Sequence, residues 1–364
     1  LPISGGDSNK KLKVGFIYEK TPQTSEWCYA HELGRQYIDE TFGKQIETVS
    51  ITNVRPKIDD YDAIQKLIDE NTDLIFVTSS AMMYASLKQA IAHPKAKILN
   101  CSLNISHKYI RTYYTRIHEA KYLTGLIAGV MSKSDRIGYV AGCPLYGVMA
   151  NVNAFAMGVK AVNPDAKVYV EWNGIKDNDV EARFNELGIN CISDQDMITP
   201  KKSSRKFGLY INDDGNIRHL AMPVWHWGKF YEQIIRLAFK STEEIEAMKG
   251  KKAVNYWWGM SADVIDVICS ENMPNGTRRL IEFLKNSIRA GSFHPFDGLI
   301  YAQDGSTKCT QGKSLNAEEI ITMNWLAQNV VGYIPKIGEM NERAQELMQL
   351  QGIKATEQTE MENE

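Results

Sequence analysis

The sequence predicts an α/β protein of two lobes, each built on a parallel β-sheet with helices on both faces. Short apolar segments alternate along the chain with helical segments of about ten to fifteen residues, an order that is typical of βαβ units. The apolar run "LIFV" at residues 74–77 has no polar alternation, as expected of a strand that is buried on both sides. A chain of 364 residues is long enough for two such domains.

The first series of segments begins with an apolar strand at residues 11–19. A helix is predicted over residues 30–43, where Gly43 ends it. The same alternation then predicts a strand at 46–53, a helix at 61–70, a strand at 73–80, a helix at 81–93 and a strand at 96–102.

A second series of segments predicts the second lobe. It begins with a strand at 136–142 and a helix at 147–164, which Asn163 and Pro164 end. It continues with a strand at 166–173, a helix at 178–188, strands at 190–194 and 207–213, and a helix at 228–241. The chain therefore crosses between the lobes near residues 223–233, "PVWHWGKFYEQ".

Composition excludes several classes of partner. The formal charge of −2 leaves no basic footprint for nucleic acid or an anionic membrane, and no apolar run approaches the roughly 20 residues of a membrane-spanning helix. The six cysteines are scattered without metal-ligand spacing, so we expect buried thiols, no metal and no cofactor. Cysteine usage does not decide the compartment.

Both ends of the chain are polar. Residues 1–11, "LPISGGDSNKK", resemble a short tether left after removal of a signal peptide, although a cloning remnant is an alternative. The acidic segment 355–364 has no apolar period, and we expect it to be disordered.

The ends of the predicted strands are rich in polar and indole side chains. In open α/β sheets, ligands bind outside the carboxyl ends of the strands. The segments at these ends are 21–27, 78–83, 193–200, 211–215 and 222–227. They predict a cleft between the lobes that combines aromatic walls with hydrogen-bonding groups.

Four tryptophans lie near predicted strand–helix junctions: Trp27, Trp225, Trp227 and Trp258. Trp225 and Trp227 are two residues apart, a spacing that would place both indoles on one face of a strand. A single tryptophan is more often a core residue. Four at predicted cleft edges favour a binding wall, where a flat heteroaromatic ring gains about 1–3 kcal/mol per stacked face.

The motifs of common enzymes are absent from the sequence. It has no Walker A loop, no dinucleotide-binding glycine motif after a strand, no H-E-x-x-H and no G-x-S-x-G. We interpret His118 and His226 as structural histidines, and residues 212–214, "NDD", as a solvated or ligand-binding loop. The sequence therefore predicts a binding protein rather than an enzyme.

Four long blocks resemble the basic membrane protein (BMP) family of type I solute-binding lipoproteins of ABC transporters, which bind purines or nucleosides. The blocks are 116–142, "RIHEAKYLTGLIAGVMSKSDRIGYVAG"; 153–168, "NAFAMGVKAVNPDAKV"; 224–231, "VWHWGKFY"; and 291–305, "GSFHPFDGLIYAQDG". The resemblance extends from about residue 12 to about residue 333. It implies a type I periplasmic-binding-protein fold, in which a three-strand hinge joins two Rossmann-like lobes.

The resemblance also implies the residues of the ligand site. Trp27 matches a tryptophan that stacks on the base in one branch of the family, and Ser79 and Ser80 match a "TS" loop. The remaining matches are Arg116 and Glu119 at the first crossing, Asp196 and Asn212 on the second lobe, and Trp225, Trp227 and Trp258 at the second and third crossings.

The sequence departs from the nucleoside-binding branch at the base-holding positions. That branch usually carries an Asp and an Asn after the first strand, whereas "TSEW" at 24–27 has neither. The segment after Pro200 looks one turn short, and Asn212 stands where relatives often have Asp. These departures favour a free purine, or a similar heterocycle, over a nucleoside.

The expected mechanism is a clamp that closes on a planar ligand by hinge rotation near residues 115, 225 and 256. The expected boundaries are 1–11 for the tether, 12–115 with 226–255 for the first lobe, 116–225 with 256–335 for the second lobe, and 336–364 for a C-terminal tail. The resemblance implies an extracytoplasmic location, at the cell surface or in the periplasm, a lipid-anchored monomer, and an ABC transporter permease as partner. Two alternatives remain open: an extracellular sensor or receptor domain, and a nucleoside-processing enzyme.

Overall fold

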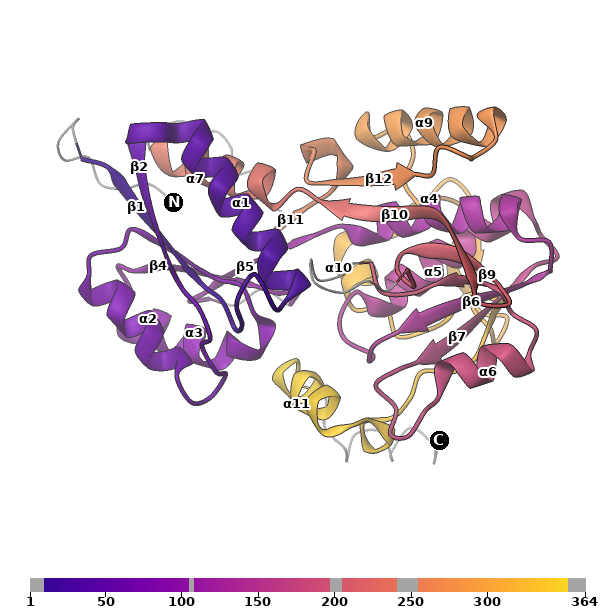
Figure 1. The fold of residues 1–364 in the computed structure, drawn as a ribbon, viewed down its shortest axis with the longest axis horizontal. Helices are drawn as coiled ribbons and strands as arrows, with labels where there is room; N and C mark the ends of the chain where they lie inside the picture. The colour runs from indigo at the N-terminus through magenta and orange to yellow at the C-terminus, as the bar shows by residue number, and fades with distance from the viewer. Residues whose placement is uncertain (1–9, 105–107, 197–204, 241–254, 353–364) are drawn as a thin grey trace.

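Two α/β lobes stand side by side in the computed structural model, with a short helix between them (Figure 1). The structure describes residues 10–104, 108–196, 205–240 and 255–352. Each lobe is built on one β-sheet, one of six strands and one of seven. The predicted α/β class with two lobes is confirmed.

All strands of the first sheet are parallel, in the order β11-β5-β4-β3-β1-β2. Its strands are β1 (Leu12–Ile17), β2 (Ile46–Ile51), β3 (Leu74–Val77), β4 (Lys97–Cys101), β5 (Arg111–Thr115) and β11 (Tyr256–Trp258). One face packs against α1 (Glu26–Phe42) and α7 (Trp227–Phe239), and the other packs against α2 (Asp60–Asp69) and α3 (Met83–Ala92). Two short 3₁₀ helices, η1 (Gly43–Gln45) and η2 (Ser80–Met82), complete the lobe.

Strand β3 is buried on both faces, as its sequence predicts. Leu74 and Phe76 pack into the core beneath α1 and α7, whereas Ile75 and Val77 pack into the core beneath α2 and α3. Successive side chains of a strand point to opposite faces, so one apolar run supplies both cores.

Helix α1 begins at Glu26 rather than at residue 30. The side chain of Ser25 accepts a hydrogen bond from the backbone N–H of Cys28 at 3.2 Å and caps the helix. This cap moves Trp27 from the predicted loop into the first turn of the helix.

The second sheet is mixed, in the order β12-β10-β9-β8-β6-β7-β15. Its strands are β6 (Arg136–Ala141), β7 (Lys167–Trp172), β8 (Cys191–Ser193), β9 (Leu209–Asp213), β10 (Asn216–Trp225), β12 (Ile265–Cys269) and β15 (Val330–Val331). Strands β9 and β12 run opposite to the others. The expectation of a parallel sheet in this lobe is therefore wrong for these two strands, because β9 and β10 form a tight hairpin instead of a helical crossover.

Helices cover both faces of the second sheet. On one face lie α4 (Ile117–Met131), α5 (Val148–Val162) and α9 (Asn275–Arg289), and on the other lies α6 (Val180–Glu186). The C-terminal part adds the hairpin of β13 (Ile300–Tyr301) and β14 (Thr307–Cys309), helix α10 (Ala317–Ile321), and the helices η4 (Met260–Ala262), η5 (Ile337–Glu339) and α11 (Glu342–Leu350).

Helices α4 and α5 approach each other closely because glycines face the contact. A Cβ atom at Gly125 would collide with the backbone of Phe155, and one at Gly158 would collide with the carbonyl oxygen of Tyr122. This pair holds the first crossing firmly against the core of the second lobe.

Three crossings join the lobes, between β5 and α4, between β10 and α7, and between β11 and β12. Strand β11 pairs with β5 in the first sheet, so the third crossing follows Trp258. The sequence assigned residues 256–335 to the second lobe, but residues 256–258 form β11 and belong to the first sheet. The boundary therefore moves from residue 256 to a position after Trp258.

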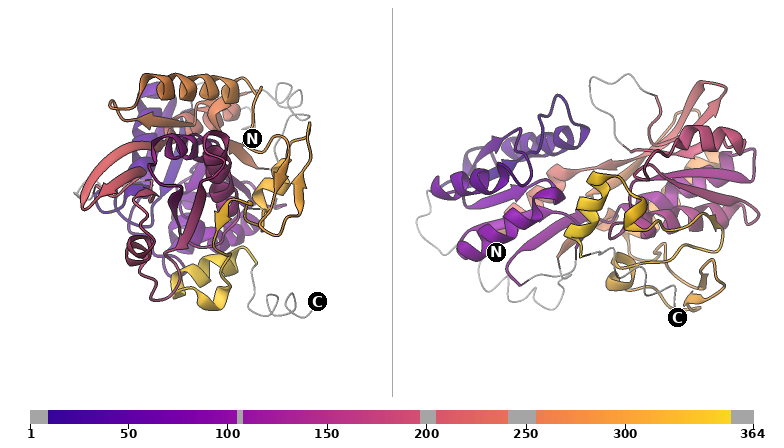
Figure 2. Two further views of the ribbon diagram at one scale, coloured as in Figure 1. Left: turned by 90° about the vertical axis from the view of Figure 1, so that its right-hand side faces the viewer. Right: turned by 90° about the horizontal axis from the view of Figure 1, so that it is seen from below.

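The ends of the chain differ from each other. Nearly all of the expected tether, residues 1–9, lies outside the described residues, as does the acidic segment 355–364. Part of the expected tail is an ordered helix, α11, which lies between the two lobes in the right-hand view of Figure 2. Among the described helices, none is long and apolar enough to cross a bilayer.

Candidate functional site

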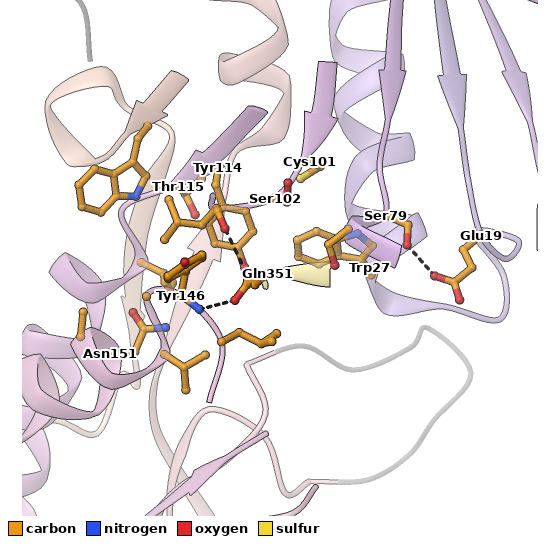
Figure 3. Close-up of a pocket in the computed structure, with 18 of the residues that line it drawn as sticks. Glu19, Trp27, Ser79, Cys101, Ser102, Tyr114, Thr115, Tyr146, Asn151 and Gln351 are labelled. Carbon is orange, nitrogen blue, oxygen red and sulfur yellow. Dashed lines mark hydrogen bonds between the residues drawn. The ribbon is translucent and has the colours of Figure 1, made fainter. Parts of the chain in front are cut away.

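A cavity of about 320 Å³ lies between the lobes, beside the first and third crossings. The first lobe contributes residues that follow β1, β3 and β4, together with the end of β5. The second lobe contributes the loop after β6 and the first turn of α5. The cavity therefore lies at the carboxyl ends of strands from both sheets, where ligands bind in open α/β folds (Figure 3).

Trp27 forms part of the cavity wall and is held in place from behind. Its indole Nε1 donates a hydrogen bond of 2.6 Å to the carbonyl oxygen of Thr78, just after β3. His31, one turn along α1, meets the indole edge-on with ring centroids 4.7 Å apart. Burial lowers the pKa of His31 to about 3, so its ring is neutral and remains in the core. The indole is thus fixed before any ligand arrives.

Tyr114 provides a second aromatic surface at the cavity. Its ring centroid lies 6.4 Å from that of Trp27, and the two planes are inclined by 24°. Both rings line the cavity (Figure 3). A planar ligand that stacks on Trp27 is therefore nearly parallel to Tyr114 as well.

Ser79 connects the β3 loop to an acidic side chain. Its hydroxyl donates to Glu19 Oε2 at 2.8 Å and also accepts from the N–H of Ala81, in η2. Ser80 and Lys20 line the same wall. The carboxylate of Glu19 is an acceptor that suits the N–H groups of a heterocycle.

Three cavity residues carry buried polar atoms without a hydrogen-bond partner among the described residues: Ser102 Oγ, Thr115 Oγ1 and Trp257 Nε1. An unmade hydrogen bond in the interior costs about 1–3 kcal/mol. A ligand with donors and acceptors along its edge would recover part of that cost after small side-chain rotations. These three atoms are the unpartnered buried polar groups at this cavity among the described residues.

The wall beside the crossings is uncharged. His118 is buried at the cavity, and burial, reinforced by the positive charge of Arg116, lowers its pKa to about 3. The ring of His118 is neutral over the physiological range of pH and can donate or accept a hydrogen bond. On the opposite wall, Asn151 in the first turn of α5 adds an amide.

Three of the ten predicted site residues line this cavity: Trp27, Ser79 and Ser80. Arg116 and Glu119 instead lie inside the hinge. Arg116 Nε donates to the carbonyl oxygen of Trp257 at 3.1 Å, and its guanidinium lies 4.3 Å from the centre of that indole ring.

Glu119 is also buried in the hinge, where its Oε1 accepts from the N–H of Met260 at 3.2 Å. Burial raises the pKa of Glu119 to about 7, although Arg116 and the Met260 N–H oppose the shift. A Cβ atom at Gly259 would collide with this carboxyl group, so the third crossing passes tightly against it. Arg116 and Glu119 thus join two crossings and do not border the cavity.

The prediction that Trp225 and Trp227 share one face of a strand is wrong. Trp225 ends β10 and Trp227 begins α7, so the strand periodicity does not apply to the pair. Trp227 is 1% exposed and stacks on His31 with centroids 4.4 Å apart. Trp258 stacks on Phe230 of α7 with centroids 4.6 Å apart. These contacts place Trp227 and Trp258 in the packing of the first lobe.

A second and larger cavity, of about 730 Å³, lies against α1 and the second crossing. Trp225, Trp227 and Asp196 border it. The indole Nε1 of Trp225 has no hydrogen-bond partner among the described residues. Asp196 accepts from Lys121 Nζ at 2.6 Å. Burial alone would lower the pKa of Lys121, but the Asp196 carboxylate outweighs it and raises that pKa.

Asn212 lies away from both cavities. Its side-chain oxygen accepts from the N–H of Gly215 at 2.8 Å and closes the turn between β9 and β10. Because β9 runs antiparallel to β8, the carboxyl end of β9 lies at the edge of the sheet that points away from the cleft. The prediction assumed a parallel strand, which explains why this residue is misplaced.

Sequence reasoning missed several residues of the cavity. These are Glu19, Ser102, Tyr114, Thr115, Trp257 and Gln351. Glu19 and Ser102 directly follow predicted or observed strands, so the same strand-end rule could have found them. Gln351 belongs to the expected tail, and no sequence pattern indicated that α11 returns to the cleft.

The site carries no arrangement typical of metal chemistry. Within the described ranges, no group of three or more His, Cys, Asp or Glu side chains could hold a metal ion. The six cysteines are free thiols, and five of them are buried.

Comparisons with known proteins identify similar sequences and folds. The family model described as "ABC transporter substrate-binding protein PnrA-like" (Bmp) matches residues 11–205. A purine-binding protein of Brucella abortus is 28% identical over 342 residues, which cover 90% of this chain and 95% of that protein. A putative ABC transporter glucose-binding protein of Haloferax volcanii is 24% identical, covering 71% of this chain and 67% of that protein.

A solved structure supports the same architecture. An ABC transporter solute-binding protein from Conexibacter woesei superposes with a TM-score of 0.54 at 14% sequence identity, covering 78% of this chain and 98% of that chain. At this level of identity the likeness concerns the fold, which is the type I periplasmic-binding fold.

Proposed function

We propose that this chain, which belongs to the Bmp family of PnrA-like ABC transporter substrate-binding proteins, captures a purine in the cavity beside Trp27 and delivers it to a membrane permease. Members of this family are extracytoplasmic solute-binding proteins of ABC transport systems. The proposal concerns the ligand, its site and the partner of this particular chain.

The observation that carries the proposal is the combination of the fixed Trp27 indole and unpartnered polar atoms around one cavity between the lobes. Indole and phenol faces give affinity for a flat ring, at about 1–3 kcal/mol for each stacked base. Glu19, Ser102 and Thr115 offer hydrogen bonds to its edge. The purine-binding relative supports this class of ligand.

A free base fits this proposal better than a nucleoside. Trp227 and Trp258, which the resemblance assigned to the ligand, are used in the packing of the first lobe, and Asn212 closes a turn. These three residues are therefore not available to a ribose. The cavity of about 320 Å³ is at the small end of the usual range for ligand pockets.

Closure of the two lobes completes the binding mechanism. Trp27 and Ser79 bind from the first lobe, and Asn151 binds from the second, so a bridging ligand favours the closed form. Rotation at the three crossings opens the cavity. We further propose that the protein acts as a monomer, tethered to the membrane surface through its N-terminal segment, and that it has no catalytic activity.

A thermal-shift panel tests the proposal, with adenine, guanine, hypoxanthine, their nucleosides and glucose as ligands. A true ligand at one hundred times its Kd stabilises the folded state by about 2.7 kcal/mol. Stabilisation by a purine base, with smaller effects from nucleosides, supports the proposal. Stabilisation by glucose alone, the sugar for which the Haloferax relative is named, would overturn it. Conversion of a nucleoside to free base during incubation would instead identify an enzyme.

A further inference from the structure

Helix α11 lies between the lobes at the mouth of the cleft (Figures 1 and 2). The side chain of Asn341 caps it by accepting from the N–H of Ala344 at 2.9 Å. This ordered helix lies within the segment 336–364, which the sequence indicated to be a tail. Its contacts with the two lobes differ in kind.

The helix is anchored to the second lobe by an apolar cluster. Met340, Ala344 and Met348 are buried together with Cys143, which follows β6. Backbone contacts strengthen this anchor, because the N–H of Asn341 donates to the carbonyl oxygen of Gly174 at 2.7 Å. The buried apolar contacts and this backbone hydrogen bond hold α11 on the second lobe, so α11 moves with that lobe.

Helix α11 meets the first lobe through two ion pairs and through Leu347 and Leu350, which border a small cavity together with Met83. Arg343 Nη1 lies 3.2 Å from Glu19 Oε1, and Lys57 Nζ lies 3.6 Å from Glu346 Oε1. The Arg343, Lys57 and Glu346 side chains are about half exposed or more, and exposed ion pairs contribute little to stability. These ion pairs form and break easily.

Gln351, just after α11, joins the two lobes through a single side chain. Its Nε2 donates to the carbonyl oxygen of Leu103, in the first lobe, at 3.2 Å. Its Oε1 accepts from the N–H of Tyr146, in the second lobe, at 2.7 Å. Both residues line the cavity together with Gln351 (Figure 3). The amide thus bridges the cleft, as a bound ligand is expected to do.

We propose that α11 and Gln351 form a strap that holds the lobes together without ligand and completes one wall of the cavity. The firm anchor stays on the second lobe, and the contacts of Gln351 and Arg343 with the first lobe break when the cleft opens. Because these contacts exist only in the closed form, they raise its population before binding and thereby raise the apparent affinity. This inference goes beyond the proposed function and does not depend on the identity of the ligand.

Two variants of Gln351 distinguish its hydrogen bond to Leu103 from its hydrogen bond to Tyr146. Gln351→Ala removes both hydrogen bonds. Gln351→Glu keeps an acceptor for the N–H of Tyr146 but places a carboxylate against the carbonyl oxygen of Leu103. Gln349→Ala, on an exposed position of the same helix, is the matched control.

Two measurements on the ligand-free full chain test the proposal. They are the radius of gyration by small-angle X-ray scattering and the rate of hydrogen exchange at the backbone amide of Tyr146. Ligand-free protein is prepared by unfolding, dialysis and refolding. We expect both Gln351 variants to have a larger radius of gyration than the parent and the Gln349→Ala control. We expect exchange at Tyr146 to accelerate about fivefold in Gln351→Ala, because one hydrogen bond contributes about 1 kcal/mol, and to change little in Gln351→Glu.

An unchanged radius of gyration in both Gln351 variants would overturn the strap. An equal increase in the radius of gyration of Gln349→Ala and Gln351→Ala would also overturn the strap, because general loosening of α11 would then explain the increase. Neither result affects the proposed ligand, since no ligand is present in these measurements.

Discussion

The indole of Trp27 and the phenol ring of Tyr114 lie 6.4 Å apart with their planes inclined by 24°, although the residues come from α1 and β5. Trp27 is fixed by its hydrogen bond to the Thr78 carbonyl oxygen, and Tyr114 is fixed within the first sheet. Two nearly parallel aromatic surfaces at one cavity favour flat ligands over spherical or extended ones.

Replacing Trp27 with alanine should weaken purine binding more than tenfold, because one stacked face contributes about 1–3 kcal/mol. Trp27→Phe keeps an aromatic face and should lose less affinity. Isothermal titration calorimetry with the tightest purine measures both. The control Trp225→Ala alters the second cavity and should leave the affinity unchanged. A greater loss from Trp225→Ala than from Trp27→Ala would assign the ligand to the second cavity.

Thr115→Val should lower ligand affinity without lowering stability. The Thr115 hydroxyl is buried without a partner, so its removal does not break a hydrogen bond in the free protein. If the ligand binds this hydroxyl, affinity falls roughly three- to tenfold, which calorimetry detects. Thr112→Val is a matched control, since Thr112 has an unpartnered hydroxyl in the same strand but does not line the cavity. Equal affinities for the two variants would exclude Thr115 from the ligand contacts.

Glu119→Gln should stabilise the protein at alkaline pH. Burial raises the pKa of Glu119 from 4.5 to about 7. The contribution of Glu119 to the free energy of unfolding is therefore fully present below pH 4.5 and is lost as the pH rises through 7. One pKa unit corresponds to about 1.4 kcal/mol, so the ionised carboxylate costs the folded state roughly 3 kcal/mol. Urea unfolding should show a free energy of unfolding higher for the variant at pH 8 and similar to the parent at pH 4.5. Glu47→Gln, at an exposed position, should show no such difference. A variant that is less stable than the parent at pH 8 would refute this account of the hinge.

Gly125→Ala should destabilise the second lobe, because the added Cβ collides with the backbone of Phe155. Overpacking of this kind costs about 1–3 kcal/mol. Gly276→Ala in α9 meets nothing within 4 Å and should be neutral or slightly stabilising. Thermal unfolding compares the two variants. Equal melting temperatures would show that α4 and α5 can move apart without loss of stability.

Much of the fold was predictable because the strands of the first lobe have unambiguous apolar runs. Strand β3 begins one residue after its predicted start and ends three residues before its predicted end, and helix α7 begins one residue before its predicted start. The antiparallel course of β9 was not predictable, because a hairpin and a crossover can follow the same apolar strand. That single difference moved Asn212 from the expected cleft to the distant edge of the sheet.

Residues of the candidate cavity could be predicted only where they directly follow a strand of a parallel sheet. Trp27 and Ser79 follow strands of the parallel sheet, so the strand-end rule placed them at the cavity. Trp227 begins a helix, and its direction depends on packing against His31, which lies far from it in the sequence. Gln351 reaches the cavity only through the packing of α11 on Cys143, a contact that no sequence period encodes.

The crystal structure of a complex with the purine that gives the largest thermal shift tests the central claim most directly. The account predicts a purine ring in the cavity between the lobes, in van der Waals contact with the face of Trp27, with its edge hydrogen-bonded to side chains of both lobes. A ring bound in the cavity beside Trp225, or outside the cleft altogether, would contradict it.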